Sequence, residues 1–348
     1  CNPVVTLMLL DIAAIIAGFA LLVWGAERFV TGASVIARNL GISPMVIGLT
    51  IVGLGTSAPE ILVSAMAAYQ GNPGLAIGNA VGSNIANIGL ILGITAVIVP
   101  LNVNSNTLKR EYPILLAVSL TTLILMLDGQ LGRLDGMILL IGLVAILFGM
   151  VHIAMRERNN GDPLKAEFEA EMPDEMSTGK ALLYFVIGLS LLLVSSKILV
   201  WGAVNIATAL GISDLVIGLT IVALGTSLPE LAASIVSALK KEHDIAIGNV
   251  IGSNMYNLLA VLSVPSLIAP GAFDPMALSR DMPVMLALTL AMFVMAYGFR
   301  GPGRINRFEG ALLVLVFIGY QAVLFLGNNE VASDNSNTLL TTPYEQHT

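Results

Sequence analysis

The segment GISPMVIGLTIVGLGTSAPEILVSAMAA, residues 41–68, recurs as GISDLVIGLTIVALGTSLPELAASIVSA at residues 211–238. The same separation of 170 residues, from Gly41 to Gly211, relates AIGNAVGSNIANIGL to AIGNVIGSNMYNLLA without a gap. The matched positions include Thr, Ser, Pro, Glu, Asn and Gly in register, which low sequence complexity does not produce. The chain therefore contains an internal duplication, with the repeats at about 41–93 and 211–263.

The composition is that of an integral membrane protein. Of the 348 residues, 56% are hydrophobic and 11% are charged, and the mean hydropathy is +0.87. Soluble domains have about 45–50% apolar and about 25% charged residues. The single cysteine, Cys1, excludes an internal disulfide framework and a thiolate metal cluster within one chain. We expect the lipid bilayer as a partner and no nucleic acid, and the sequence leaves the oligomeric state open, a monomer included.

Ten stretches are long and apolar enough to span a bilayer, which takes about 20 residues. They lie at 8–34, 42–69, 75–100, 112–128, 136–155, 181–208, 212–239, 245–270, 282–299 and 309–327. An acidic linker at 156–180 separates a first half at 1–155 from a second half at 181–327, and a polar tail at 328–348, expected to be disordered, follows. Each half holds five spans, an odd number, so the second copy must enter the membrane in the opposite orientation. The predicted fold is all-α and polytopic, with ten transmembrane helices in two inverted-topology repeats of five.

The positive charges between the spans agree with this count. If the N-terminus lies outside, the outer side holds only Arg133 and Arg280. The inner side, which includes the linker, holds Arg38, Lys109, Arg110, Arg156, Arg158, Lys165, Lys180, Lys240, Lys241, Arg300, Arg304 and Arg307. The positive-inside rule therefore predicts a protein of the cell (inner) membrane with both termini outside the cytoplasm.

Oxygen-bearing side chains surround the glutamate of GTSAPE. Thr56 and Ser57 precede Glu60 by four and three residues, so the three side chains share one face of a helix. Pro59 cannot donate a backbone hydrogen bond and opens the preceding turn, which frees carbonyls around Gly53 to Gly55 as ligands. The second copy repeats this pattern with Thr226, Ser227, Pro229, Glu230 and the carbonyls of Ala223 to Gly225. A plain kink with a paired carboxylate is the simpler interpretation, but the recurrence of the whole neighbourhood favours a ligand-forming break.

The motif GNAVGSN and its copy GNVIGSN provide the other wall of this site. Each contains two glycines four residues apart, which permit close helix approach: Gly78 with Gly82, and Gly248 with Gly252. Each also places a hydroxyl and an amide oxygen on one helix face: Ser83 with Asn87, and Ser253 with Asn257. Asn84 and Asn254 fall away from that face and serve either as ligands or as hydrogen bonds between helices.

The resulting ligand set contains oxygen only. Two carboxylates, several hydroxyls, amide oxygens and backbone carbonyls suit hard cations, above all Ca²⁺ and also Na⁺. The three histidines lie outside the motifs, at His152, His243 and His347, which argues against zinc or copper. Magnesium fits less well because it dehydrates reluctantly.

At these residues the sequence resembles the calcium/cation antiporter superfamily and, within it, the prokaryotic sodium/calcium exchangers. The resemblance is carried by GTSAPE with GNAVGSNIAN and by GTSLPE with GNVIGSNMYN. It implies a secondary active antiporter that exchanges Na⁺ for Ca²⁺ by alternating access and exports Ca²⁺. Both ions would be transported substrates, and no cofactor is expected.

The resemblance also implies roles for single residues. Glu60 and Glu230 would be central ligands of both ions, and Asn87 and Asn257 would complete the centre. Ca²⁺ would also be held by Thr56 and Thr226, and Na⁺ by Ser57, Ser83, Ser227 and Ser253. The carbonyl ligands would come from Gly53 and Ala223. Some relatives carry Asp at the position of Asn257, and its absence argues against potassium co-transport and against proton coupling through a third carboxylate.

Three alternatives stay open, and one of them, a non-transporting membrane scaffold, predicts no ion flux at all. A proton/calcium or other cation antiporter would use the same scaffold. An intramembrane hydrolase that uses the two glutamates is a remote alternative, because the chain has no H-E-x-x-H, no G-x-S-x-G and no histidine near the motifs. We therefore expect a transporter and not an enzyme.

Overall fold

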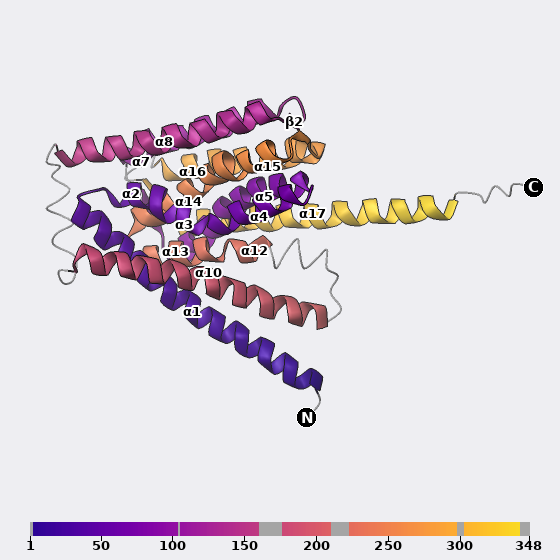
Figure 1. Ribbon diagram of the computed structural model, residues 1–348, viewed down its shortest axis with the longest axis horizontal. Helices are drawn as coiled ribbons and strands as arrows, with labels where there is room; N and C mark the ends of the chain where they lie inside the picture. Colours follow the sequence, from indigo (N-terminus) through magenta and orange to yellow (C-terminus); the bar gives the residue numbers. More distant parts are fainter. Residues whose placement is uncertain (1–2, 104, 160–175, 210–222, 298–302, 342–348) are drawn as a thin grey trace, which may run out of the picture.

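The computed structural model is a bundle of long helices, most of which run in one common direction (Figure 1). It describes residues 3–103, 105–159, 176–209, 223–297 and 303–341. The first half consists of α1 (Pro3–Leu40), α2 (Pro44–Ile47), η1 (Gly48–Val52), α3 (Gly53–Thr56), α4 (Ala58–Tyr69), α5 (Pro73–Ala86), η2 (Asn87–Leu92), α6 (Gly93–Ile98), β1 (Leu101–Val103), α7 (Ser105–Met126), β2 (Gln130–Leu131) and α8 (Arg133–Asn159). The second half consists of α10 (Thr178–Ala209), α12 (Ala223–Thr226), α13 (Leu228–Leu239), α14 (His243–Tyr256), η4 (Asn257–Val261), α15 (Ser263–Ile268), β3 (Gly271–Ala272), η5 (Ala277–Asp281), α16 (Met282–Ala296), β4 (Gly303–Ile305) and α17 (Arg307–Thr341).

Most of the expected membrane spans are present as apolar helices. Among the described residues, seven helices are long and apolar enough to cross a membrane, and the bent pair Pro44–Thr56 and Ala58–Tyr69 makes an eighth candidate. The fourth expected span, 112–128, coincides with α7, which starts with polar residues. The seventh, 212–239, is described only from Ala223, since residues 210–222 lie outside the described part of the chain.

Capping side chains followed by proline set the starts of two central helices. Ser43 and Asn72 each accept a hydrogen bond from the backbone N–H three residues further on, and thereby cap α2 and α5. The next residues, Pro44 and Pro73, occupy the first helical position, where a missing N–H costs no hydrogen bond. The residues at which α2 and α5 begin are therefore determined by the local sequence.

Within the described residues, π-helical turns interrupt three spans near the repeated motifs. η1 leads directly into α3, η2 begins at Asn87 and η4 begins at Asn257, 170 residues later. Such turns recur at functional sites because they disturb the regular ladder of backbone hydrogen bonds. One carbonyl in η1, that of Thr50, accepts a hydrogen bond from the hydroxyl of Tyr256 in the other half at 3.0 Å.

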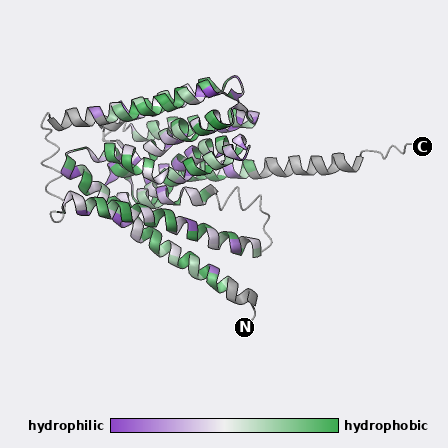
Figure 2. Ribbon diagram, in the orientation of Figure 1, coloured by the Kyte–Doolittle hydropathy of each residue, from purple (hydrophilic) through white to green (hydrophobic). Residues whose placement is uncertain are grey.

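The repeated segments form the centre of the bundle, and the remaining long helices surround them. Every residue from Ile245 to Ser263 in the apolar span His243–Ile268 is buried. By contrast, the outward faces of the peripheral helices expose large apolar side chains, among them Phe19, Phe148 and Leu315. Figure 2 shows the same pattern, with hydrophobic surfaces along the outer helices. An apolar exterior of this kind is suited to lipid.

α1 and α10 cross in close contact over much of their length along one side of the bundle (Figure 1). A Cβ atom at Gly188 of α10 would lie 2.3 Å from the backbone nitrogen of Phe29 in α1, so only glycine permits this approach. The amide of Asn205 donates to Asp11 at 2.8 Å, and the amide of Asn39 donates to the carbonyl of Met176 at 3.0 Å. Polar contacts thus connect the two helices near both ends of an otherwise apolar interface.

The two halves contact each other through equivalent pairs of elements. β1 of the first half pairs antiparallel with β4 of the second, and β2 of the first half pairs antiparallel with β3 of the second. In the same way, α6 packs against α17, and α15 packs against α8. The described residues are mostly helical, as the predicted all-α class requires, and segments between the spans add two short ribbons, because extended backbone outside the spans completes its hydrogen bonds there.

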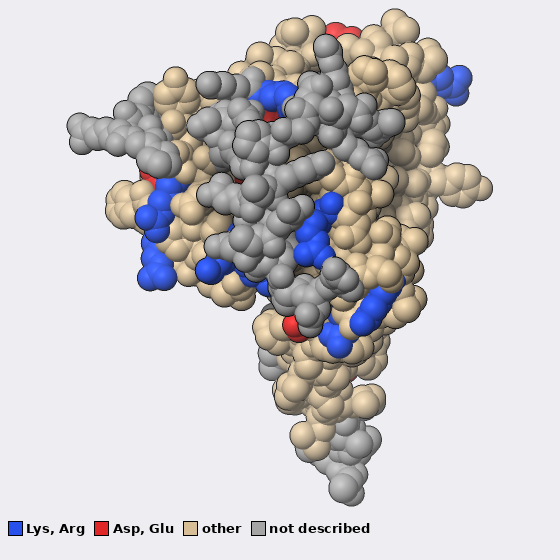
Figure 3. Space-filling view, turned by 90° about the vertical axis from the view of Figure 1, so that its left-hand side faces the viewer, with Lys and Arg blue, Asp and Glu red and all other residues tan. Residues whose placement is uncertain are grey.

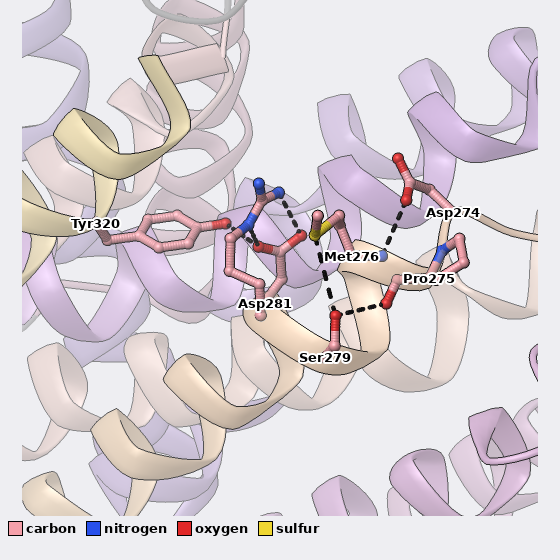
Figure 4. A network of polar contacts seen from close by, with 7 residues as sticks. Asp274, Pro275, Met276, Ser279, Asp281 and Tyr320 are labelled. Carbon is pink, nitrogen blue, oxygen red and sulfur yellow. Dashed lines mark hydrogen bonds and ion pairs between the residues drawn. The ribbon is translucent and has the colours of Figure 1, made fainter. Parts of the chain in front are cut away.

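A carboxylate–arginine pair occurs at the same position in each half. Arg110 Nε lies 2.7 Å from Glu111 Oε1, and Arg280 Nε lies 2.6 Å from Asp281 Oδ1. The two pairs are separated by 170 residues, so the duplication extends beyond the quoted motifs. In the second half the hydroxyl of Tyr320 on α17 also donates to Asp281 Oδ1 at 3.0 Å (Figure 4). This network ties the start of α16 to the last helix.

Both polar segments that the sequence sets apart are shorter than expected. α8 continues to Asn159 and α10 begins at Thr178, while residues 160–175 of the linker lie outside the description. α17 continues as a helix to Thr341, whereas disorder was expected from 328. Extending an existing helix adds one hydrogen bond for each residue that is fixed, so an apolar helix can propagate into a polar sequence.

Candidate ion-binding site

A break in the second span sets Glu60 at the start of a new helix. α3 ends at Thr56, the backbone of Ser57 leaves the helical range at φ −81° and ψ 4°, and α4 follows at an angle of 43°. Pro59 is in the first turn of α4, where its missing N–H is tolerated. Ser57 N donates to the carbonyl of Gly53 at 3.0 Å, so this oxygen has a partner and offers an ion only its second lone pair.

The second half repeats the break. Ser227 has φ −91° and ψ 5° between α12 and α13, and Glu230 lies in the first turn of α13. Ala223 is the first residue of α12. The nitrogen of Ser227 donates to the carbonyl of Leu224 at 3.2 Å. Proline and serine therefore produce a similar break twice, in which Ser57 N bonds to the carbonyl of Gly53 and Ser227 N bonds to that of Leu224.

The two glutamates are buried and are contacted by the opposite half. Glu60 is 1% exposed and Glu230 is 2% exposed. Ser57 Oγ donates to Glu230 Oε1 at 3.5 Å, and the side chain of Thr56 is also hydrogen-bonded to Glu230. In the reverse direction the side chain of Thr226 is hydrogen-bonded to Glu60. Hydroxyls of the hexapeptide GTSAPE thus contact the carboxylate of GTSLPE, and a hydroxyl of GTSLPE contacts the carboxylate of GTSAPE.

The serine and asparagine pairs of α5 and α14 are buried and lie where these helices change to π-helical turns. Asn87 is the first residue of η2 and Asn257 is the first residue of η4. Ser83 and Ser253 lie one turn earlier, and all four side chains are buried.

The asparagines that the sequence left undecided join the two halves. Asn84 Nδ2 donates to the backbone carbonyl of Asn254 at 3.2 Å, and Asn87 Nδ2 donates to Asn254 Oδ1 at 3.0 Å. Asn84 and Asn254 therefore form hydrogen bonds between helices, while Asn84 Oδ1 is buried without a hydrogen-bond partner among the described residues. Because the amide group of Asn87 faces Asn254, its oxygen points elsewhere.

Several buried oxygens of these side chains have no hydrogen-bond partner among the described residues. They are Glu60 Oε2, Glu230 Oε2, Asn87 Oδ1, Asn257 Oδ1 and Ser253 Oγ. A buried polar atom without a partner costs about 1–3 kcal/mol, and more if it is charged. Cations coordinated by these oxygens would remove that cost.

Comparisons with known proteins agree with this geometry. Residues 10–151 and 180–326 match the family described as sodium/calcium exchanger protein.

The chain belongs to this exchanger family.

Among its relatives, the putative antiporter CaxA of Alkalimonas amylolytica is 52% identical over 318 residues, covering 91% of this chain and 99% of CaxA. The inner membrane protein YrbG of Escherichia coli (strain K12) is 43% identical over 319 residues, covering 91% and 98% of the two chains. A solved structure of the sodium-calcium exchanger NCX_Mj, soaked with Na⁺ and Sr²⁺, superposes with a TM-score of 0.77 at 36% identity and covers 90% of this chain and 98% of NCX_Mj. The exchanger is therefore a helical membrane transporter of cations and not an enzyme.

The donor set of the exchanger fits a transported hard cation. In the part of the chain that the structure describes, no three His, Cys, Asp or Glu side chains cluster as a metal site. The site therefore combines two carboxylates with neutral hydroxyl and amide oxygens, a set that suits Ca²⁺ and Na⁺ better than transition metals.

Sequence reasoning missed a pair of asparagines behind the glutamates. Asn79 Nδ2 donates to the carbonyl of Glu60 at 3.2 Å and to Ser64 Oγ at 3.1 Å. Asn249 Nδ2 makes the equivalent contacts in the other half of the exchanger, with Glu230 O at 3.2 Å and Ser234 Oγ at 3.0 Å. The signal was available, because both asparagines follow a glycine inside the quoted motifs.

The predicted close packing of small residues is confirmed in the second half of the exchanger. A Cβ atom at Gly252 would lie 2.5 Å from the carbonyl oxygen of Leu49, and one at Gly248 would lie 2.9 Å from that of Met45. These glycines let α14 approach α2 and η1 of the first half. The segment related to Met45–Leu49 by the repeat is 215–219, so the equivalent prediction for the first-half glycines lies outside the described residues.

Proposed function

We propose that this exchanger is a secondary active antiporter that moves Na⁺ in one direction and Ca²⁺ in the other. The observation that carries the proposal is the buried pair of carboxylates, Glu60 and Glu230, each contacted by hydroxyls of the opposite half. The similarity to NCX_Mj, a sodium-calcium exchanger, supports sodium as the counter-ion.

The ligands in this proposal are the predicted twelve residues. Glu60, Glu230, Asn87 and Asn257 form the centre, and their unpartnered oxygens support the assignment. The remaining ligands are the hydroxyls of Thr56, Thr226, Ser57, Ser227, Ser83 and Ser253 and the carbonyls of Gly53 and Ala223. Two carboxylates balance one Ca²⁺ or two Na⁺, so the ions exclude each other from one overlapping site by charge alone.

In the proposed topology, ten spans form two inverted repeats with both termini outside the cytoplasm. Lys and Arg side chains are visible on the face that Figure 3 turns toward the viewer, which is the left-hand end of Figure 1. The start of α1 and the end of α17 lie away from that face (Figure 1). The reciprocal ribbons β1–β4 and β2–β3 support a two-fold relation between the halves. Alternating access would then arise from exchange of conformation between the repeats.

The proposed direction is Ca²⁺ export. If three Na⁺ entered for each Ca²⁺ that left, one net charge would move inward per cycle. A membrane potential contributes about 2.3 kcal/mol per charge per 100 mV, so the potential would favour this direction.

Uptake of radioactive Ca²⁺ into proteoliposomes tests the function. Vesicles loaded with Na⁺ should accumulate Ca²⁺ when diluted into Na⁺-free buffer, and dissipation of the Na⁺ gradient should abolish uptake. Uptake that ignores the Na⁺ gradient but follows a pH gradient would instead support the proton/calcium alternative, and a K⁺ gradient tests co-transport in the same way.

Substitution of the carboxylates tests the site. Glu60→Gln and Glu230→Gln each remove one charge with little change of shape, and each should reduce exchange at least a hundredfold. The matched control is Glu27→Gln: Glu27 is 58% exposed and lies 3.8 Å from Lys240. Full exchange by either site variant would refute the site.

A further inference from the structure

Asn249 is buried, and both the NH₂ group and the oxygen of its side-chain amide make hydrogen bonds. It is 1% exposed, and both of its N–H groups have acceptors, the carbonyl of Glu230 and the hydroxyl of Ser234. Its Oδ1 lies 3.1 Å from Thr56 Oγ1, which belongs to the other half of the chain. One side chain therefore contacts a central carboxylate residue of one repeat and a candidate hydroxyl ligand of the other.

The orientation of this amide is fixed by chemistry. The carbonyl of Glu230 can only accept, so the NH₂ group of Asn249 must face it. The amide oxygen is then directed to Thr56, whose hydroxyl must donate to it. Asn79 makes the same two NH₂ donations, to Glu60 and Ser64, so this part of the arrangement is built into both copies.

The direction of the Thr56 hydrogen matters for a cation. A hydroxyl oxygen coordinates a cation through its lone pairs, so its single hydrogen must point to an acceptor elsewhere. Thr56 Oγ1 has several acceptors in reach: the carbonyls of Val52 and Gly53, at 3.2 and 3.3 Å, Asn249 Oδ1 at 3.1 Å, and the carboxylate of Glu230, which is a proposed ligand. The first two belong to its own helix, and Gly53 is itself a candidate ligand. Asn249 takes the hydrogen without occupying a ligand.

We propose that Asn249 is a positioning residue for Ca²⁺: it holds the backbone at Glu230 and accepts the Thr56 hydrogen, which leaves the Thr56 lone pairs for the ion. Asn79 holds the backbone at Glu60 in the same way. The inference rests on the proposed function, in which Thr56 serves Ca²⁺ and the serines serve Na⁺. Asn249 thereby tunes the preference between the two ions.

Asn249→Leu, which keeps the approximate size and removes donor and acceptor, tests this role in proteoliposomes. We expect the apparent KM for Ca²⁺ to rise about fivefold, the effect of one hydrogen bond, while the maximal rate and the apparent affinity for Na⁺ stay within about twofold. A residue with only a structural role would shift both ions together or lower the rate. Ser234→Ala is the matched control, because it removes a contact of the same amide but not the one to Thr56, and should leave KM within about twofold.

The link through Thr56 is tested in two backgrounds. In Thr56→Ser, which keeps the hydroxyl, Asn249→Leu should again raise KM about fivefold, whereas in Thr56→Val, which lacks it, the further change should be below about twofold. Equal effects in both backgrounds, or an effect of Ser234→Ala as large as that of Asn249→Leu, would overturn the proposal. Asn249→Ala is measured in the same way if the leucine variant is not recovered folded. Absence of Ca²⁺ flux in the unmodified protein would instead refute the proposed function.

Discussion

Ser57 Oγ lies 3.5 Å from Oε1 of Glu230, a residue 173 positions further along the chain. The two belong to different copies of the repeated hexapeptide and both are buried. A hydroxyl and a carboxylate from opposite halves therefore meet in the proposed site, and neither half alone supplies all of its proposed ligands.

Ser57→Ala tests this contact. Loss of the hydroxyl removes a donor to Glu230 and a candidate Na⁺ ligand, so we expect the apparent affinity for Na⁺ to fall about two- to tenfold. The control is Ser190→Ala, since Ser190 is exposed and bonds only to the carbonyl of Val186 in its own helix among the described contacts. Na⁺-dependent Ca²⁺ uptake at varied Na⁺ is the measurement, and an unchanged Na⁺ affinity would contradict a ligand role.

Gly252→Ala tests the close approach of α14 to η1. The added methyl group would lie 2.5 Å from the carbonyl oxygen of Leu49, and overpacking of this kind costs about 1–3 kcal/mol. We expect a lower melting temperature in detergent and reduced transport. Gly319→Ala on the outer helix α17, where a Cβ atom meets nothing within 4 Å, should be tolerated. Similar melting temperatures for both variants would contradict the packing described.

The raised pKa of Glu242, a residue outside the membrane spans, predicts that the stability of the protein depends on pH. Burial raises the pKa of Glu242 above its usual value, and nearby Asp244 raises it further, against opposing effects of Ser34 and Lys240. The folded state thus holds this proton more tightly than the unfolded state, so stability falls as pH rises from the ordinary glutamate pKa through the raised one. Glu242→Gln should increase the melting temperature more at pH 8 than at pH 5. Glu27→Gln, at an exposed residue, should show no such difference.

Tyr320→Phe tests the network at the start of α16. The phenol donates to Asp281 at 3.0 Å, and a hydrogen bond to a charged group contributes about 1.5–3 kcal/mol. We expect a lower melting temperature with ion affinities unchanged, because the contact lies outside the proposed site. In an Asp281→Asn background the loss should be smaller. The control is Tyr69→Phe, at a side chain that is 86% exposed.

Much of the central architecture could be predicted because the repeat places polar residues in register. The spacing of Thr56, Ser57 and Glu60 and its copy at a separation of 170 residues were enough to expect two half-sites. The contacts of Ser57 with Glu230 and of Thr226 with Glu60 agree with that expectation.

Other features could not be predicted, for physical reasons. The π-helical turns at Asn87 and Asn257 depend on tertiary packing and have no local sequence signal of their own. Asn249 contacts Thr56 across 193 residues, a pairing that only the three-dimensional arrangement specifies. The strand pairing of Leu101 with Ile305 is likewise a long-range contact.

The crosswise pairing of the halves has a consequence for biogenesis. β1 pairs with β4 and α6 packs against α17, both near the far end of the chain. β2 pairs with β3, and α8 packs against α15, which are also in the second half. The first half of the chain is therefore synthesised before the surfaces against which β1, α6, β2 and α8 pack. Assembly of the bundle is a late, concerted event, and a ribosome that stalls before the last helix releases a product with an unfinished core.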